Sequence, residues 1–83
     1  MKSEVDIEGL IRLITSEFDD IDPKLLSPES LFKEVIEWNS INSLVLSVVI
    51  EAEYGVLLEK GDYEKTTTVA DLMTAVASKI DSL

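Results

Sequence analysis

The sequence contains no histidine and no cysteine, and its basic residues number only seven against seventeen acidic ones. Without cysteine the chain has neither a disulfide framework nor a thiol nucleophile, which suits a reducing compartment, and we expect the protein to be cytoplasmic. Without histidine a serine nucleophile lacks its usual general base, and ordinary zinc sites lack a usual ligand. The three glycines are isolated, so the sequence holds no phosphate-binding glycine loop. We therefore predict that the protein is not an enzyme.

The charge is strongly one-sided, with a net value of −10 at pH 7 and a sequence pI near 4.1. Nucleic acids and anionic membrane surfaces are bound through basic groups, so we predict neither as a partner. No apolar run approaches the length of a membrane span, and we expect no secretory signal and no membrane insertion. Basic protein surfaces are the partners that such a charge favours.

Length and hydrophobicity predict one folded domain. The 83 residues have room for a single small core, and the 46% hydrophobic content is too high for a disordered acidic tail. We assign residues 1–83 to one domain and expect a monomer.

An acidic run near residue 20 is the one candidate for a metal site. Counted from Asp20, an EF-hand would place Asp22 at its third position, but Leu25 and Leu31 fall where glycine and glutamate are required. We predict a solvated turn and no metal.

The stretch from residue 37 to residue 55 is the most informative part of the chain. Asn39 is a good N-cap residue, which places Ser40 in the first turn of a helix, and Gly55 is a suitable end. Two apolar lines follow at helical spacing, one formed by Ile41, Leu44, Val45, Val48, Val49 and Ala52 and the other by Leu46 and Ile50. A helix that is apolar most of the way round needs cover on several sides, so we expect part of it to meet a partner or ligand.

Helices are also predicted on both sides of this stretch. A capping box predicts that a first helix starts at Ser3, and acidic residues before Pro23 predict that it ends near Phe18. Residues 19–38 form a long connection, in which Ser27-Pro28 suits the start of a helical turn.

Beyond Gly55, residues 56–58 are predicted to close over the core and residues 61–65 to form a turn or one short helix. Thr68 and Asp71 predict a capped last helix whose apolar side carries Val69, Leu72, Met73, Val76 and Ile80. The fold class is therefore all-α, an antiparallel four-helix bundle of three main helices and one short one.

Two segments of this sequence resemble the acyl carrier protein family. Trp38-Asn39-Ser40-Ile41 is similar to the Asp-Ser-Leu that heads the second helix of that family, and Glu51-Ala52-Glu53-Tyr54-Gly55 is similar to the acidic run and aromatic residue at its end. Counting back from Tyr54 by the family spacing of about fourteen residues leads to Ser40. The similarity extends over nearly the whole chain and implies the same four-helix fold.

The resemblance implies a function for Ser40. A phosphopantetheinyl transferase would attach 4′-phosphopantetheine from coenzyme A to this serine, and the terminal thiol would carry an acyl group as a thioester. Acyl-loading and acyl-using enzymes of a lipid or secondary-metabolite pathway, fatty acid biosynthesis among them, would be the partners. The residues expected to bind partners or to shelter the chain are Trp38, Asn39, Ile41, Leu44, Val45 and Val48.

The sequence departs from the family pattern in ways that leave alternatives open. Asn39 replaces the family aspartate and Ile41 its leucine, while Asn42, Val45 and Ala52 stand where acids are often found, which indicates a more apolar docking face and a specialised set of partners. Ser40 could also be nothing more than a cap residue. An unmodified interaction module with the carrier fold, or an aminoacyl or peptidyl carrier, are the competing functions.

Two other serines resemble the attachment site. Asp81-Ser82-Leu83 matches the family tripeptide letter for letter, but no helix follows it. Ser43 lies about one helical turn inside the central helix, where a modifying enzyme would have poorer access.

Overall fold

The computed structural model describes residues 5–82, in which every regular element is a helix. Its elements are α1 (Ile7–Glu17), a 3₁₀ turn η1 (Pro23–Leu25), α2 (Phe32–Val35), α3 (Ser40–Tyr54), α4 (Lys60–Glu64) and α5 (Val69–Asp81). No strand occurs among the described residues, where extended pairing is limited to one antiparallel bridge between Leu31 and Thr68. The all-α prediction is confirmed, although two short α-helices, α2 and α4, accompany the three long ones instead of one.

The first helix begins later than the sequence predicted. Asp6 is its N-cap, with extended φ and ψ of −125° and 161°, and its carboxylate accepts the N–H of Gly9 at 2.6 Å. Asp6 thus fulfils the capping role that was predicted for Ser3, which itself lies outside the described residues. The helix ends as predicted. Its last residue is Glu17, and Phe18 is the C-cap, whose N–H donates to the carbonyl of Ile14 at 2.9 Å.

The Ser27-Pro28 segment forms a hydrogen-bonded turn and not the start of a helix. The N–H of Ser30 donates to the carbonyl of Ser27 at 3.0 Å, and the chain becomes helical only at Phe32. Two carbonyls of this segment are used elsewhere: Pro28 accepts the N–H of Ala70 at 2.9 Å and Ser30 accepts that of Val69 at 3.0 Å. The segment therefore binds the start of α5.

The last helix agrees closely with its prediction. The hydroxyl of Thr68 accepts the N–H of Asp71 at 3.1 Å, and the carboxylate of Asp71 accepts the N–H of Thr68 at 3.1 Å. The predicted apolar side is the buried side, with Val69, Leu72, Val76 and Ile80 inside and Met73 partly buried.

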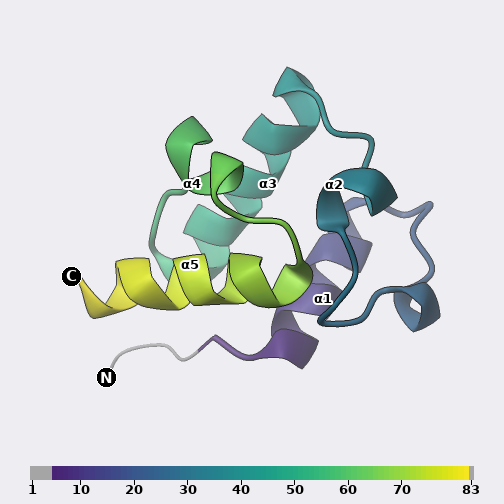
Figure 1. The fold of residues 1–83 in the computed structure, drawn as a ribbon, viewed down its shortest axis with the longest axis horizontal. Coiled ribbons are helices and arrows are strands. Elements are labelled where there is room, and N and C mark those ends of the chain that lie inside the picture. Colours follow the sequence, from purple (N-terminus) through teal and green to yellow (C-terminus); the bar gives the residue numbers. More distant parts are fainter. Residues whose placement is uncertain (1–4, 83) are drawn as a thin grey trace.

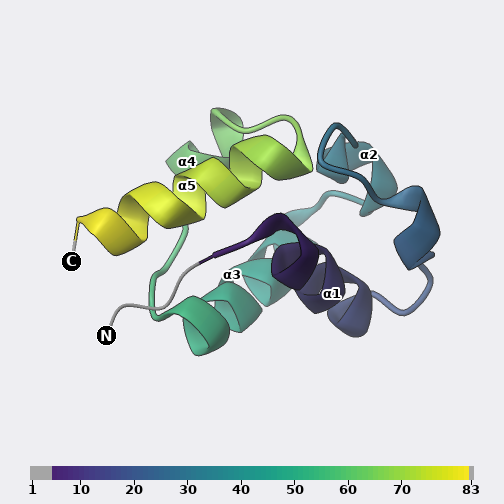
Figure 2. The ribbon, with the colours of Figure 1, turned by 90° about the horizontal axis from the view of Figure 1, so that it is seen from below.

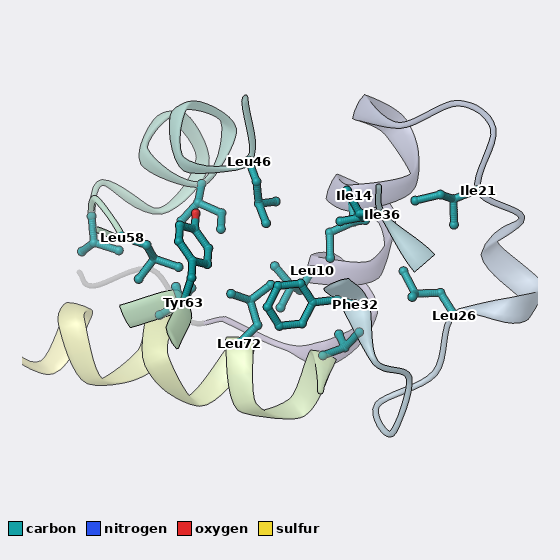
Figure 3. Close-up of a cluster of buried hydrophobic side chains, with 14 of the residues drawn as sticks. Leu10, Ile14, Ile21, Leu26, Phe32, Ile36, Leu46, Leu58, Tyr63 and Leu72 are labelled. Atoms are coloured by element: carbon teal, nitrogen blue, oxygen red, sulfur yellow. The ribbon is translucent and has the colours of Figure 1, made fainter. Parts of the chain in front are cut away.

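The core lies where α1 packs against both α3 and α5. Figure 1 shows α5 running along one edge of the molecule, and Figure 2 shows it on the opposite side from α1 and α3, together with α2 and α4. Phe32, Leu10 and Leu72 meet in the middle of the buried cluster (Figure 3). Val56 and Leu58, in the connection after α3, are also buried as predicted, whereas Leu57 between them is exposed.

Candidate functional site

The start of α3 is built as the sequence predicted. Asn39 is the N-cap, with φ and ψ of −153° and 177°, and its side-chain oxygen accepts the N–H of Asn42 at 2.8 Å. The amide group of Asn42 donates in turn to the carbonyl of Glu37 at 2.7 Å, which fixes the entering chain. Ser40 is the first residue of the helix and is exposed.

This helix start has backbone donors to offer. The first N–H groups of a helix lack intrahelical acceptors, and the N–H groups of Ser40 and Ile41 have no hydrogen-bond partner among residues 5–82. They lie at the positive end of the dipole of a 15-residue helix. A negatively charged group attached to the Ser40 hydroxyl would be stabilised there.

The three candidate serines differ in what their hydroxyls do. The Ser43 hydroxyl donates to the carbonyl of Ser40 at 3.0 Å, and the Ser82 hydroxyl donates to that of Ser78 at 2.9 Å. Ser82 is moreover the C-cap of α5, at the negative end of a helix. Ser40 is exposed, and its hydroxyl makes no hydrogen bond within the part of the chain that the structure describes.

An open groove of about 650 Å³ begins beside Ser40 and runs between α3 and the segment around α4. Its lining consists of Lys33, Trp38, Asn39, Ser40, Ser43, Leu44, Ser47, Leu57, Leu58, Lys60, Tyr63 and Glu64. Ser40, Ser43 and Ser47 recur at a spacing that keeps them on one face of α3. The groove is therefore continuous from the exposed serine along the length of two helical turns.

The charge of the groove differs from that of the whole chain. Two of the seven basic residues, Lys33 and Lys60, line it together with one carboxylate, Glu64, although the protein carries a net charge of −10. An anionic group that enters the groove would thus share it with two lysine side chains, and attraction of this kind is screened by salt.

Aromatic packing holds one wall of the groove. The ring centroid of Trp38 lies 5.4 Å from that of Phe32 and 5.0 Å from that of Tyr63, both in edge-to-face geometry. The ammonium of Lys33 lies 5.9 Å from the Trp38 centroid and donates to the carbonyl of Tyr63. These contacts tie α2 and α4 to the loop that precedes Ser40.

A buried pair of hydroxyls belongs to two residues that line the groove, Ser47 and Tyr63. The oxygens of Ser47 and Tyr63 are 2.6 Å apart, and the Ser47 oxygen also lies 2.9 Å from the carbonyl of Ser43 and 3.2 Å from that of Leu58. Figure 3 shows the Tyr63 hydroxyl pointing away from α5. Burial raises the pKa of Tyr63 above its ordinary value, and the hydrogen bond with Ser47 opposes the rise only in part, so the phenol stays protonated at neutral pH.

The residues expected to bind partners are divided between the groove and the outer surface. Trp38, Asn39 and Leu44 line the groove, whereas Ile41, Val45 and Val48 are not among its lining residues. Ile41, Leu44 and Val48 are exposed by 74%, 64% and 54%, and Val45 and Trp38 are partly buried. The sequence did not indicate four of the lining residues, Lys33, Ser47, Lys60 and Tyr63, and only the seven-residue spacing of Ser47 from Ser40 could have indicated one of them.

Two further tests bear on other kinds of site. Among the described residues, no helix is both long and apolar enough to cross a membrane. Residues 5–82 also contain no group of three or more histidine, cysteine, aspartate or glutamate side chains placed to hold a metal ion.

Comparison with known proteins gives distant relatives of one kind. The chain is 29% identical to an acyl carrier protein of Thermosynechococcus vestitus over 78 residues, which are 94% of this chain and 96% of the relative. It is also 29% identical over 72 residues to a protein of Schizosaccharomyces pombe assigned as a mitochondrial acyl carrier protein, covering 86% of this chain and 64% of that protein. No protein-family model matches the sequence. These similarities support a carrier role.

Proposed function

We propose that the protein carries acyl intermediates as thioesters on a 4′-phosphopantetheine arm attached to the Ser40 hydroxyl. The arm supplies the thiol that the sequence lacks. The observation that carries the proposal is the exposed, uncommitted hydroxyl of Ser40 at an open helix start, in a chain similar to acyl carrier proteins over nearly its whole length.

The attachment is a group transfer for which Ser40 is the acceptor. Its oxygen forms a bond to the phosphorus of the pantetheine phosphate, and the phosphoanhydride bond of coenzyme A breaks. Adenosine 3′,5′-bisphosphate leaves with the electron pair, and the hydroxyl proton passes to a base on the transferase. This chain would supply the nucleophile and its position, while the partner enzyme supplies the catalysis.

The residues around Ser40 fit a phosphodiester. The backbone N–H groups of Ser40 and Ile41, at the start of α3, could donate hydrogen bonds to the phosphate oxygens, as at many helix starts that bind phosphate. Lys33 and Lys60 line the adjoining groove and would offset the phosphate charge in an acidic protein. Asn39 caps the helix without adding a carboxylate that would repel the phosphate.

The exposed apolar side of α3 supports a docking role. Ile41, Leu44 and Val48 project three large aliphatic side chains from the helix that presents Ser40. We assign this face, flanked by Val45, Trp38 and Asn39, to the transferase and to acyl-loading and acyl-using enzymes. The proposal includes the four-helix arrangement of the carrier family, formed here by α1, α3 and α5 with one short helix.

An unmodified interaction module is the second candidate. Asn39 replaces the aspartate that the carrier family places before its serine, and the exposed apolar face of α3 would suit protein binding without any arm. The two functions differ in whether Ser40 accepts a phosphopantetheine group.

Mass spectrometry separates these candidates. The purified protein is incubated with coenzyme A and a phosphopantetheinyl transferase of broad specificity, and its mass is compared before and after. We expect the mass to rise by one phosphopantetheine in the wild type, in Ser43→Ala and in Ser82→Ala, and to stay unchanged in Ser40→Ala. An unchanged wild-type mass with several transferases contradicts the carrier function, and an adduct that persists in Ser40→Ala contradicts the site.

A further inference from the structure

The Ser47–Tyr63 hydroxyl pair lies within reach of a chain attached at Ser40. Ser47 follows Ser40 by seven residues on the same face of α3, which at 1.5 Å per residue is about 10 Å along the helix axis. Both residues line the groove, and Leu44 lies between them. A chain that leaves Ser40 and lies along α3 therefore meets the Ser47–Tyr63 hydroxyl pair before it leaves the groove.

The hydroxyl pair is buried but retains hydrogen-bonding capacity. Ser47 and Tyr63 are exposed by only 6% and 5%, and each hydroxyl has one proton and two lone pairs. When Tyr63 donates to Ser47 and Ser47 donates to a carbonyl, the phenolic oxygen still has lone pairs to offer. When Ser47 donates to Tyr63, the phenolic proton is free to point elsewhere. The pair can therefore present an acceptor or a donor to a group in the groove.

The surroundings of the pair are mostly apolar. Leu44, Leu57, Leu58 and Trp38 form apolar walls of the same groove. Methylene groups suit these walls but form no further hydrogen bond with the pair, which is already hydrogen-bonded within the protein. An amide or an oxygen substituent at the same depth would make one.

We propose that the Ser47–Tyr63 pair is a positioning and selectivity element, which holds the tethered chain along α3 through a hydrogen bond to an amide, carbonyl or hydroxyl group about 10 Å from Ser40. This inference rests on the proposed attachment at Ser40. Two sources could supply the group: the amides of the arm itself, or an oxygen-bearing acyl cargo. If the cargo supplies the group, the groove also discriminates against a bare saturated chain.

The test uses protein that mass spectrometry shows to carry the arm on Ser40. Failure to attach the arm would contradict the proposed function, whereas an attached chain that does not contact the Ser47–Tyr63 pair would contradict only the present inference. Three forms are prepared: the free-thiol arm, a saturated acyl form and a 3-hydroxyacyl form of equal chain length. NMR chemical shifts of the Tyr63 ring and of the Ser47 and Leu58 amides are compared with those of the unloaded protein.

Each result has one meaning for the proposal. Shifts in the free-thiol form identify the arm's amides as the held group, and shifts that arise only in the 3-hydroxyacyl form identify the cargo. Absence of shifts at these residues in all three forms overturns the proposal. It is also overturned if the free-thiol form is silent and the saturated form shifts them as strongly as the 3-hydroxyacyl form.

Tyr63→Phe is the matched variant, because it removes the hydroxyl and keeps the ring that packs on Trp38. Loss of one hydrogen bond should lower the population of the held chain by about 2- to 10-fold, and the shifts at Ser47 and Leu58 should shrink accordingly. Undiminished shifts in a folded Tyr63→Phe protein contradict the proposal. Ser47→Ala serves the same purpose, with the Tyr63 ring as the reporter, if Tyr63→Phe does not fold.

Discussion

The two longest helices, α3 and α5, begin with the same kind of cap but differ in what remains free at their first turns. In α5 the N–H groups of Val69, Ala70 and Asp71 are all taken, by the carbonyls of Ser30 and Pro28 and by the Thr68 hydroxyl. In α3 the cap accepts the N–H of Asn42 only, and those of Ser40 and Ile41 have no acceptor in residues 5–82. The start of α5 is closed by the fold, whereas the start of α3 is open to another molecule.

The apolar sides of the two helices differ in the same sense. The stripe on α5 is inside the core, with Val69, Leu72 and Val76 fully buried. On α3 only one apolar line is inside, and Leu44 and Ile41 of the other line are more than half exposed. Apolar residues of α5 therefore stabilise the fold, and those on the outer side of α3 remain available for binding.

Paired truncations of one leucine in each helix test this difference and should give the largest effect. Leu72→Ala in α5 removes a fully buried side chain and should lower the free energy of unfolding by about 2–5 kcal/mol. Leu44→Ala in α3 removes a side chain that is 64% exposed, and the change should stay within about 0.5 kcal/mol. Urea unfolding followed by circular dichroism measures both.

A comparable loss in the two variants would mean that the outer side of α3 belongs to the core after all. Modification of Leu44→Ala by the transferase gives a second readout. A slower transfer at unchanged stability is the result expected of a docking residue.

The ends of the two helices give a smaller contrast. α3 ends at Gly55, whose φ of 75° lies in the left-handed region, whereas α5 ends at Ser82 with φ of −85°. Gly55→Ala should lower the free energy of unfolding by about 1–2 kcal/mol, because a Cβ disfavours that backbone conformation. No atom lies within 4 Å of the position that this Cβ would take, so the effect is conformational and not a clash.

Gly61→Ala in α4 is the matched control. Its added Cβ would also meet nothing within 4 Å, and its φ is not positive. Alanine should raise stability there by about 0.4–1 kcal/mol, because it restricts the unfolded chain. Thermal unfolding of the two variants should therefore move in opposite directions, and a shift in the same direction would contradict the assignment of strain to Gly55.

The sequence was sufficient to predict those helix starts and ends that depend on residues within one helical turn. The N-cap at Asn39, the end at Gly55 and the capping box of Thr68 and Asp71 depend on residues three or four apart, and all are confirmed. The start of α1 was wrong because Ser3 and Asp6 are both good caps at that spacing, and the sequence does not say which one the fold uses.

Tertiary contacts limited the rest of the prediction. A helix as apolar as α3 does not reveal from its spacing which line is buried, and the structure buries Leu46 and Ile50 of the shorter line. The Ser47–Tyr63 pair joins residues 16 positions apart, and the Lys33 bond to the Tyr63 carbonyl spans 30. Neither of these two contacts lies within one helix, so the spacing of residues along a single helix could not indicate the groove.

The third difference between the two helix starts is in how stability depends on pH, and it should be smaller than the effects of the leucine and glycine substitutions. The N–H groups of Thr68 and Thr67 hold the pKa of Asp71 below its ordinary value, whereas α3 has no acidic residue in its first turn. A carboxyl group whose pKa is lower in the folded state stabilises the fold above its unfolded pKa of about 3.9, and this contribution is lost as the pH falls through the lower folded value. The urea concentration at the unfolding midpoint should therefore fall less steeply with pH below about pH 5 in Asp71→Asn than in the wild type. In Asn39→Asp, which gives α3 a similar carboxylate, it should fall more steeply. If Asp71→Asn leaves the acid slope unchanged, the carboxylate does not stabilise α5, and the start of that helix depends on Thr68 and the Ser30 and Pro28 carbonyls alone.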